Sequence, residues 1–462
     1  MHKRFSLIML MLFVLHLYAP AQTPSTATVA ITAPTPAELG LRSGPMLGYS
    51  ELTEVALWVQ TTRPARVQLR YWIEGRPSTS QLSAPILTTH EGDHIAHVVL
   101  SYLNAGQRYG YELYLDGKLV TLPHRLVFQT QAHWQWRTDP PAFTVAIGSC
   151  AYVNEKEHDR PGEPYGADFD IFPALTAKQP DVMLWLGDNV YYREPDFFSA
   201  DFMRHRNAHA RQLLEWQALL AATHNYAIWD DHDYGPNDSD WTYRLKREAL
   251  EIFKSYWANP AYGMEGAPGV FFQFMWADVD FFMLDDRYYR TPDDGPETPD
   301  KTMFGKTQLR WLKDALLASR APFKIIANGS QMLNPQPGGE GFSKFKQEQA
   351  ELLSSIKTAK INGVLFLTGD VHRSELIRLN DPSFYPLYDY SSSPLTSGTY
   401  SADRVAANAA RVEGTLVAGK RNFGMLRFEG PRGERKLTME CYDRAGKLLW
   451  QQEVKASELQ VK

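Results

Sequence analysis

The segment that decides the fold is LWLGDNVYY, residues 184–192. Its apolar run is typical of a strand buried on both faces of a sheet, and the run ends shortly before Asp188. A carboxylate that follows such a strand is presented at the edge of the sheet, where open α/β sheets bind their ligands. We therefore expect a functional acid at this strand end.

Three other apolar runs end in the same way. IGSC ends at Cys150, AIWDDHD carries Asp231 and His232, and LFLTGDVH carries Asp370 and His372. Taken singly, an acid after a strand is most often a helix cap, and a lone cysteine or histidine is most often a buried core residue. Four strand ends that together supply oxygen, nitrogen and sulfur donors instead indicate a metal site.

Length and composition limit the class of protein. A chain of 462 residues exceeds what one hydrophobic core normally organises, so two or three structural units are expected. The formal net charge of −5 provides no basic surface for nucleic acid. An anionic substrate must therefore be attracted by local metals or arginines, and the sequence leaves the oligomeric state undetermined.

The N-terminal region has the pattern of a targeting segment. Residues 1–21 resemble a signal peptide, with Lys3 and Arg4 before an apolar run and small residues at Ala19 and Ala21. Residues 22–40, rich in Thr, Pro and Ala, are expected to form a linker. No later apolar run is long enough for a membrane span, so we expect the protein to be secreted or periplasmic.

Residues 41–135 are expected to form an all-β sandwich. Short alternating strands follow one another without a helical period between them, and Asp116 and Gly117 lie between apolar residues as in a hairpin turn. The segment LNAGQRYGYEL resembles part of a fibronectin type III or immunoglobulin-like sandwich, with Leu103, Tyr109 and Tyr111 facing inward. Such a unit is more typical of docking or structure than of catalysis.

Residues 141–462 alternate near-continuous apolar strands with amphipathic helices, which predicts an α/β fold, a four-layer α/β/β/α sandwich. One predicted helix covers residues 308–320 and has Thr307 as its N-cap. Its apolar stripe consists of Leu309, Leu312, Leu316 and Leu317. Strands within residues 420–455 are expected to extend the same sheets.

The donor types restrict the choice of metal. Asp188 is the natural bridging ligand, because a carboxylate can bind two cations through its two oxygens. Calcium and magnesium avoid a thiolate such as Cys150, zinc rarely accepts a phenolate such as Tyr191, and ferric iron accepts both. Asp231 and Asp370 would suit a hard divalent cation beside it.

Two neighbouring cations would favour displacement at phosphorus. Such a pair clamps an in-line reaction and holds a hydroxide as the nucleophile at neutral pH. His232 is the candidate general acid, and the alternative is that it only orients Asp231. Arg287 is a candidate phosphate contact, although a salt-bridged structural role beside Asp285 and Asp286 is the preferred alternative.

Five motifs carry a family resemblance. They are GSC (residues 148–150), GDNVY (187–191), WDDHD (229–233), LDDRYYR (284–290) and GDVH (369–372). Over residues 143–394 the chain resembles the PhoD-like alkaline phosphatases, a branch of the calcineurin-like metallophosphoesterases. The resemblance implies a metallophosphoesterase sandwich and a secreted hydrolase of small phosphate mono- or diesters that uses iron with calcium, or another divalent cation.

The resemblance also implies roles for single residues. Cys150, Tyr191 and His372 would bind iron, Asp188 would bridge, and Asp231 and Asp370 would hold the partner metal. His232 stands where the family has its proton-donating histidine. A further histidine of related enzymes is absent from IIANGSQM, where Asn328 or Gln331 would have to substitute.

Other interpretations remain open at this level. One is a non-catalytic, metal-binding cell-surface protein, against which the thiol of Cys150 argues; another is a zinc hydrolase of a different ester type, for which neither HExxH nor GxSxG occurs in the expected context. Asn237 or Asp238 would bind an additional cation or belong only to a turn, the preferred interpretation. Tyr165, Tyr192 and Tyr234 are candidate aromatic residues at the mouth of the site.

Overall fold

The computed structural model describes residues 35–336 and 339–461. The predicted signal peptide and residues 22–34 of the predicted linker lie outside this range. Residues 35–40, expected to belong to the linker, form a turn in which Leu39 is buried. Among the described residues, no helix combines the length and apolar character that crossing a bilayer requires.

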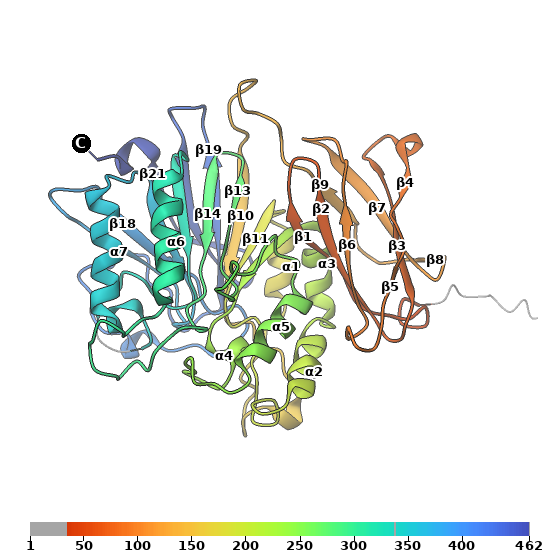
Figure 1. The fold of residues 1–462 in the computed structure, drawn as a ribbon, viewed down its shortest axis with the longest axis horizontal. Coiled ribbons are helices and arrows are strands. Elements are labelled where there is room, and N and C mark those ends of the chain that lie inside the picture. The colour runs from red at the N-terminus through yellow and green to blue at the C-terminus, as the bar shows by residue number, and fades with distance from the viewer. Residues whose placement is uncertain (1–34, 337–338, 462) are drawn as a thin grey trace, which may run out of the picture. The chain divides into compact units, whose positions relative to one another are not determined.

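The N-terminal unit is a β-sandwich (Figure 1). One sheet contains β1 (Leu41–Ser50), β2 (Val55–Thr61) and β6 (Ile95–Leu100). The other contains β3 (Arg66–Ile73), β4 (Gln81–Leu82), β5 (Ile86–Leu87), β7 (Arg108–Leu115), β8 (Lys118–Val120) and β9 (Val127–Gln129). As predicted, Leu103, Tyr109 and Tyr111 are buried in its core, and Asp116 and Gly117 turn the chain between β7 and β8 with positive φ.

The first sheet of the larger unit has the order β12-β11-β10-β19-β20-β21. Its strands are β10 (Phe143–Gly148), β11 (Val182–Leu186), β12 (His224–Ile228), β19 (Asn422–Glu429), β20 (Lys436–Asp443) and β21 (Leu448–Lys455). Strands β10, β11 and β12 are parallel, and the three C-terminal strands continue the sheet in antiparallel fashion.

The second sheet has the order β13-β14-β15-β16-β18-β17. Its strands are β13 (Phe272–Trp276), β14 (Val279–Met283), β15 (Phe323–Ala327), β16 (Val364–Thr368), β17 (Glu375–Leu379) and β18 (Leu387–Ser391). The four inner strands are parallel, and the edge strands β13 and β17 are antiparallel to them.

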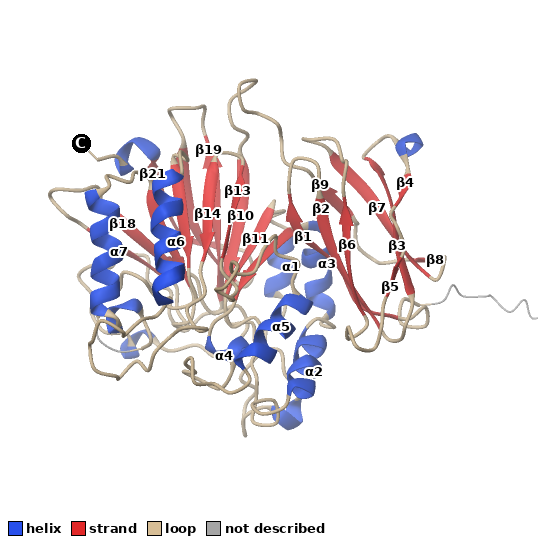
Figure 2. Ribbon diagram, viewed as in Figure 1, coloured by secondary structure: helices blue, strands red, loops and turns tan. Residues whose placement is uncertain are grey.

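The two sheets pack face to face and helices cover their outer faces (Figure 2). Between the sheets, the ring of Tyr226 on β12 stacks on Phe274 of β13, with centroids 3.8 Å apart. The helices are α1 (Ile171–Thr176), α2 (Ala200–Ala210), α3 (Leu214–Ala222), α4 (Asp231–Tyr234), α5 (Lys246–Tyr256), α6 (Gly305–Ala318) and α7 (Lys346–Thr358). Short 3-10 helices occupy Pro77–Thr79, Lys156–His158, Phe342–Lys344, Ala402–Arg404 and Ala456–Leu459.

Helix α3 packs on the first sheet, where the ring centroid of Trp216 lies 5.0 Å from that of Trp185 on β11. Helices α6 and α7 cover the second sheet (Figure 2). The predicted four-layer α/β/β/α sandwich, preceded by an all-β sandwich, is confirmed. The two units are joined directly, because Asn225 donates to the Leu47 carbonyl at 2.9 Å and the Ser50 amide donates to the Tyr226 hydroxyl at 3.0 Å.

The predicted start of α6 was wrong. The helix begins at Gly305, whose amide donates to the Thr302 hydroxyl at 2.7 Å, and Thr307 lies within its first turn. The chain just before the helix is held by Glu348 of α7, which accepts from the Met303 amide at 2.6 Å. Leu317 is 57% exposed, because it lies one residue beyond the buried stripe and therefore about 100° further round the helix.

Candidate metal centre

The strand ends predicted from the sequence meet at one place. Cys150 follows β10, Asp188 follows β11 and Asp231 follows β12, three parallel neighbours in the first sheet. Asp370 and His372 follow β16 of the facing sheet. Since parallel strands end at the same edge, their loops converge there, as expected for a ligand site in an α/β fold.

The backbone at these positions is strained. Cys150, Asp188, Asp370 and His372 have φ values of 59°, 53°, 66° and 49°, in the left-handed region that non-glycine residues seldom adopt. Such conformations cost on the order of 1–3 kcal/mol each and cluster at functional sites. The strain on four residues from three strand ends supports a functional role for their side chains.

Two glycines allow the loops to approach one another. A Cβ added to Gly187, which has a φ of 88°, would lie 2.6 Å from the Cβ of Asp230. One added to Gly369 would lie 2.6 Å from the side chain of Ser149, across the two sheets. Both distances are shorter than carbon atoms tolerate, so these contacts require glycine.

Around Asp188 lies a group that we call the thiol-phenol half: Cys150, Tyr191 and His372. The Cys150 thiol donates to Asp188 Oδ2 at 3.3 Å, and the Tyr191 hydroxyl donates to the same oxygen at 3.0 Å. The Tyr191 hydroxyl is also 3.3 Å from His372 Nε2. Cys150, Asp188 and His372 each offer a ligand atom within 4.8 Å of the others. Ser393 supports the group by donating to Cys150 Sγ at 3.1 Å.

Burial keeps the thiol-phenol half without charge. It raises the pKa of Cys150 to about 12 and also raises that of Tyr191, while burial together with the neighbouring Cys150 raises the pKa of Asp188 well above its usual value. Burial lowers the pKa of His372 to about 4, so its imidazole is neutral, the form that binds metals. A strongly charged cation would displace protons from the thiol and phenol.

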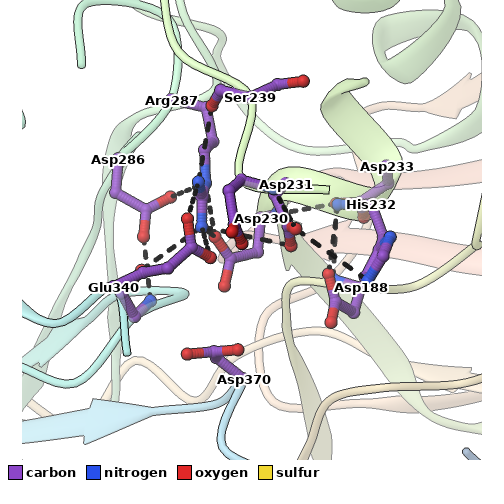
Figure 3. Close-up of polar contacts among 12 residues, drawn as sticks. Asp188, Asp230, Asp231, His232, Asp233, Ser239, Asp286, Arg287, Glu340 and Asp370 are labelled. Atoms are coloured by element: carbon purple, nitrogen blue, oxygen red, sulfur yellow. Dashed lines mark hydrogen bonds and ion pairs between the residues drawn. The ribbon is translucent and has the colours of Figure 1, made fainter. Parts of the chain in front are cut away.

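The second group, the carboxylate half, consists of Asp231, Glu340 and Asp370, which Figure 3 shows, together with Asp238. Asp231, Asp238 and Glu340 have carboxylate oxygens within 4.8 Å of one another, and Asp231 also lies within this distance of Asp188 and His232. Asp188 thus belongs to both halves, as expected for a bridging ligand. Although burial raises the pKa of Asp231, the charges of His232 and Arg287 outweigh it and hold the pKa below its usual value.

Asp370 projects toward the other acids from the opposite sheet (Figure 3). No described residue donates a hydrogen bond to its carboxylate, and burial, Glu340 and Asp231 raise its pKa. Nearby, Asp230 Oδ2 and Asn328 Oδ1 are buried without a hydrogen-bond partner among the described residues, and Asp286 Oδ1 has only an ion pair at 3.9 Å with Arg287 Nε. Unpaired buried acceptors beside several carboxylates are costly unless cations neutralise them, so the donor set fits bound metal ions.

Arg287 is enclosed by protein acceptors. It is fully buried, donates to both oxygens of Glu340 at 2.8 Å and donates from Nε to Asp230 Oδ1 at 2.6 Å. Weaker contacts at 3.4 Å reach Ser330 and Ser239. This geometry supports the salt-bridged structural role that was preferred from the sequence over a direct contact with phosphate.

His232 lies between the halves. Its ring centroid is 4.2 Å from that of Tyr191, and its Nε2 is 3.9 Å from Asp231 Oδ2. Its Nδ1 is buried without a partner among the described residues. Burial lowers the pKa of His232 although Asp231 opposes this, so the protonated ring is a stronger acid than a free imidazolium.

The structure changes some of the site assignments that were made from the sequence. Glu340 was not anticipated, because it lies in a glycine-rich loop far from the end of the preceding strand, β15. For Asp238 a turn was preferred over a cation-binding role, yet its carboxylate joins the carboxylate half. The Gln331 side-chain amide donates hydrogen bonds to Glu375 and Ser391.

Of the three tyrosines expected at the mouth, Tyr192 and Tyr234 are core residues. Only Tyr165 contacts the centre through its side chain, by a 3.2 Å hydrogen bond to His372 Nδ1.

Comparison with known proteins identifies the family. A family model described as PhoD-like phosphatase matches residues 145–441, and one described as a domain of unknown function, DUF7800, matches residues 38–133. Alkaline phosphatase D of Bacillus subtilis strain 168 is 23% identical in a match that covers 68% of this chain and 60% of that relative. The chain therefore spans less than two thirds of that relative's length.

Solved structures share the fold. One described as the structure of PhoD has a TM-score of 0.72 at 17% identity, covering 90% of this chain and 91% of its own. The purple acid phosphatase PPD1 from yellow lupin seeds (Lupinus luteus) has a TM-score of 0.62 at 11% identity, covering 89% of this chain and 74% of its own. With the strand-end motifs in place and the first family model matching more than half of its residues, the chain belongs to the PhoD-like phosphatase family.

Proposed function

We propose that this chain hydrolyses small phosphate mono- or diesters by in-line displacement at the centre described above. The observation that carries the proposal is the position of Asp188 between two sets of donors. Cys150 and His372 lie on one side of it, and Asp231 and His232 lie on the other. Family membership supports the reaction class. Binding without catalysis, the alternative from the sequence, gives no reason for a buried thiol beside the carboxylates.

The proposed ligands divide as the two halves do. Cys150, Tyr191, His372 and one oxygen of Asp188 would hold ferric iron, a cation that accepts thiolate and phenolate. Asp188, with Asp231 and Asp370, would hold calcium or another hard divalent cation, to which Glu340 and Asp238 would add negative charge. When bound, such cations supply Lewis-acid activation of the phosphoryl group and of the attacking water.

The protein's own groups would carry the proton and the alignment. As the oxygen of water bonds to phosphorus, the ester P–O bond breaks, and the leaving oxygen takes a proton from His232, whose protonated form Asp231 favours and burial opposes. Asp231 Oδ2 lies 3.9 Å from His232 Nε2, where it would stabilise the protonated ring, and Arg287 fixes Glu340 and Asp230. In this account Arg287 is a positioning residue.

We also propose that the protein is exported. The proposal rests on residues 1–21, where two basic residues, an apolar run and small residues follow one another as in a signal peptide. Fractionation of cells that express the full chain, with N-terminal sequencing of the product, tests it. A mature N-terminus near residue 22 outside the cytoplasm is expected, and an uncleaved cytoplasmic chain would refute the proposal.

The central experiment measures metal content and turnover on one purified sample. Hydrolysis of p-nitrophenyl phosphate and bis(p-nitrophenyl) phosphate is followed before chelation, after chelation and during a calcium titration. We expect iron in the protein and turnover that depends on calcium. A folded protein that contains both metals and hydrolyses neither ester would favour the non-catalytic alternative.

A further inference from the structure

We propose that Arg160 binds the phosphate of the substrate at the mouth of the centre. This inference deepens the proposed function and rests on it. Arg160 is exposed, and no described residue accepts a hydrogen bond or forms an ion pair with its guanidinium. Its contact is with the face of Tyr165, where the guanidinium carbon lies 3.8 Å from the ring centroid. The planar donors of the guanidinium are thus available to a ligand.

Tyr165 places this guanidinium beside the metal ligands. The Tyr165 hydroxyl is 3.2 Å from His372 Nδ1, and its ring centroid is 6.5 Å from that of Tyr191. Arg160 therefore stacks on the aromatic residue that contacts the thiol-phenol half.

The loop around Arg160 is held by one carboxylate. Asp159 Oδ1 accepts from the Tyr152 hydroxyl at 2.7 Å and from the Arg160 amide at 2.7 Å, and its Oδ2 accepts from the Tyr165 amide at 3.1 Å. The acid adjacent to Arg160 in sequence is therefore occupied by the loop. Asp159 thereby fixes the backbone of this loop, and the guanidinium of Arg160 has no hydrogen-bond acceptor among the described residues.

The other arginines near the centre are already paired. Arg287 donates to Glu340 and Asp230, and Arg290 donates to both oxygens of Asp293 at 2.9 Å. A phosphate that approaches a centre with several carboxylates needs a cation of its own, and a guanidinium with free parallel donors matches phosphate oxygens. Among these three arginines, Arg160 is the one with donors to offer.

The charge of the substrate predicts which class of phosphate ester depends most on Arg160. A phosphate monoester is a dianion above its second pKa, whereas a diester carries one charge and has one oxygen fewer to present. The guanidinium should therefore favour monoesters and inorganic phosphate over diesters. We expect Arg160 to contribute to binding and to monoester preference more than to the chemical step.

The test compares Arg160→Ala and Arg160→Lys with Arg244→Ala in the intact, metal-loaded protein. Arg244 is a matched control, because it is exposed and its guanidinium carbon lies 4.8 Å from the ring of Phe198. KM and kcat are measured for p-nitrophenyl phosphate and bis(p-nitrophenyl) phosphate at constant ionic strength. Binding of inorganic phosphate is measured separately by calorimetry.

Arg160→Ala should raise KM for the monoester and the Kd for inorganic phosphate about tenfold, the size expected for a lost charge-assisted hydrogen bond. Diester KM and both kcat values should change less, Arg160→Lys should be intermediate, and Arg244→Ala should match the wild type. Unchanged phosphate affinity in Arg160→Ala, or an equal loss in Arg244→Ala, overturns the proposal. If the wild type hydrolyses neither ester, the proposed function fails, and calorimetry alone then decides the role of Arg160.

Discussion

The two halves of the centre share Asp188 and the same kind of strand-end loop, yet they differ in charge. The thiol-phenol half consists of donors that burial keeps neutral, since it raises the pKa of Cys150 and Tyr191 and lowers that of His372. The carboxylate half gathers four acids, with Arg287 as a buried counter-charge paired to Glu340. Burial disfavours the charged form in both halves, but in the carboxylate half the charges of His232 and Arg287 outweigh it at Asp231 and keep the pKa of that acid low.

The difference in charge and donor type determines which cation each half can accept. Removing protons from a buried thiol and phenol requires a strongly charged metal that bonds to them directly. The acids need only positive charge and oxygen coordination, which a hard divalent cation provides and which Arg287 already provides in part. We therefore expect the two metals to be lost by different treatments and through different substitutions.

Asp188→Asn should have the largest effect, because it damages both halves at once. Loss of the shared carboxylate should lower kcat/KM on the order of a thousandfold, a barrier change of several kcal/mol, with reduced content of both metals. Turnover and elemental analysis are measured on the same sample. Asp314→Asn, on the exposed surface of α6, is the matched control. If only one metal were lost, Asp188 would not be a bridge.

Cys150→Ser should weaken iron binding in the thiol-phenol half and leave calcium binding in the carboxylate half almost unchanged. The hydroxyl is a poorer ligand than a thiolate for the strongly charged metal, so iron affinity and turnover should fall about a hundredfold, in the upper range for perturbed metal sites. Calcium binding, followed by calorimetry, should change little because the carboxylate half is intact. Equal loss of both metals would show that the halves are not independent, and circular dichroism checks that the variant folds.

Glu340→Gln should perturb the carboxylate half alone. The variant removes one charge near Asp231 and weakens the paired contacts to Arg287, so the calcium concentration for half-maximal activity should rise about tenfold. Iron content should stay at the wild-type level. Glu413→Gln, at an exposed position, controls for the loss of charge. Glu340 would have no role in the centre if the calcium requirement did not move.

Tyr191→Phe should have the smallest effect on turnover. The ring that packs against His232 is retained, but the hydroxyl that contacts Asp188 and His372 and would bind iron is lost, so a reduction of about tenfold, the lower end of the range for perturbed metal sites, is expected. The informative measurement is the visible absorption of the iron-loaded protein, which should shift when a phenolate ligand is removed. An unchanged spectrum would mean that Tyr191 only hydrogen-bonds to the ligands.

The sequence by itself determined the elements and donors whose signal is local. An apolar run ending before Asp188 or Asp370 fixes both a strand and the residue at its end, and parallel strands bring such ends together. The alternating strands of the N-terminal unit and the Asp116-Gly117 turn are local in the same sense. This is why the fold class and the family could be predicted without any structure.

Only the tertiary structure decided which distant groups meet. Glu340 lies in a loop more than 100 residues from Asp231, and no period or motif connects them. The residues just before α6 are held by Glu348 of another helix, and the burial of Tyr192 depends on packing between layers. Whether Arg160 or Arg287 has free donors depends likewise on which acids lie beside each one. Local sequence sets backbone period and donor type, whereas charge pairing follows from how the loops pack.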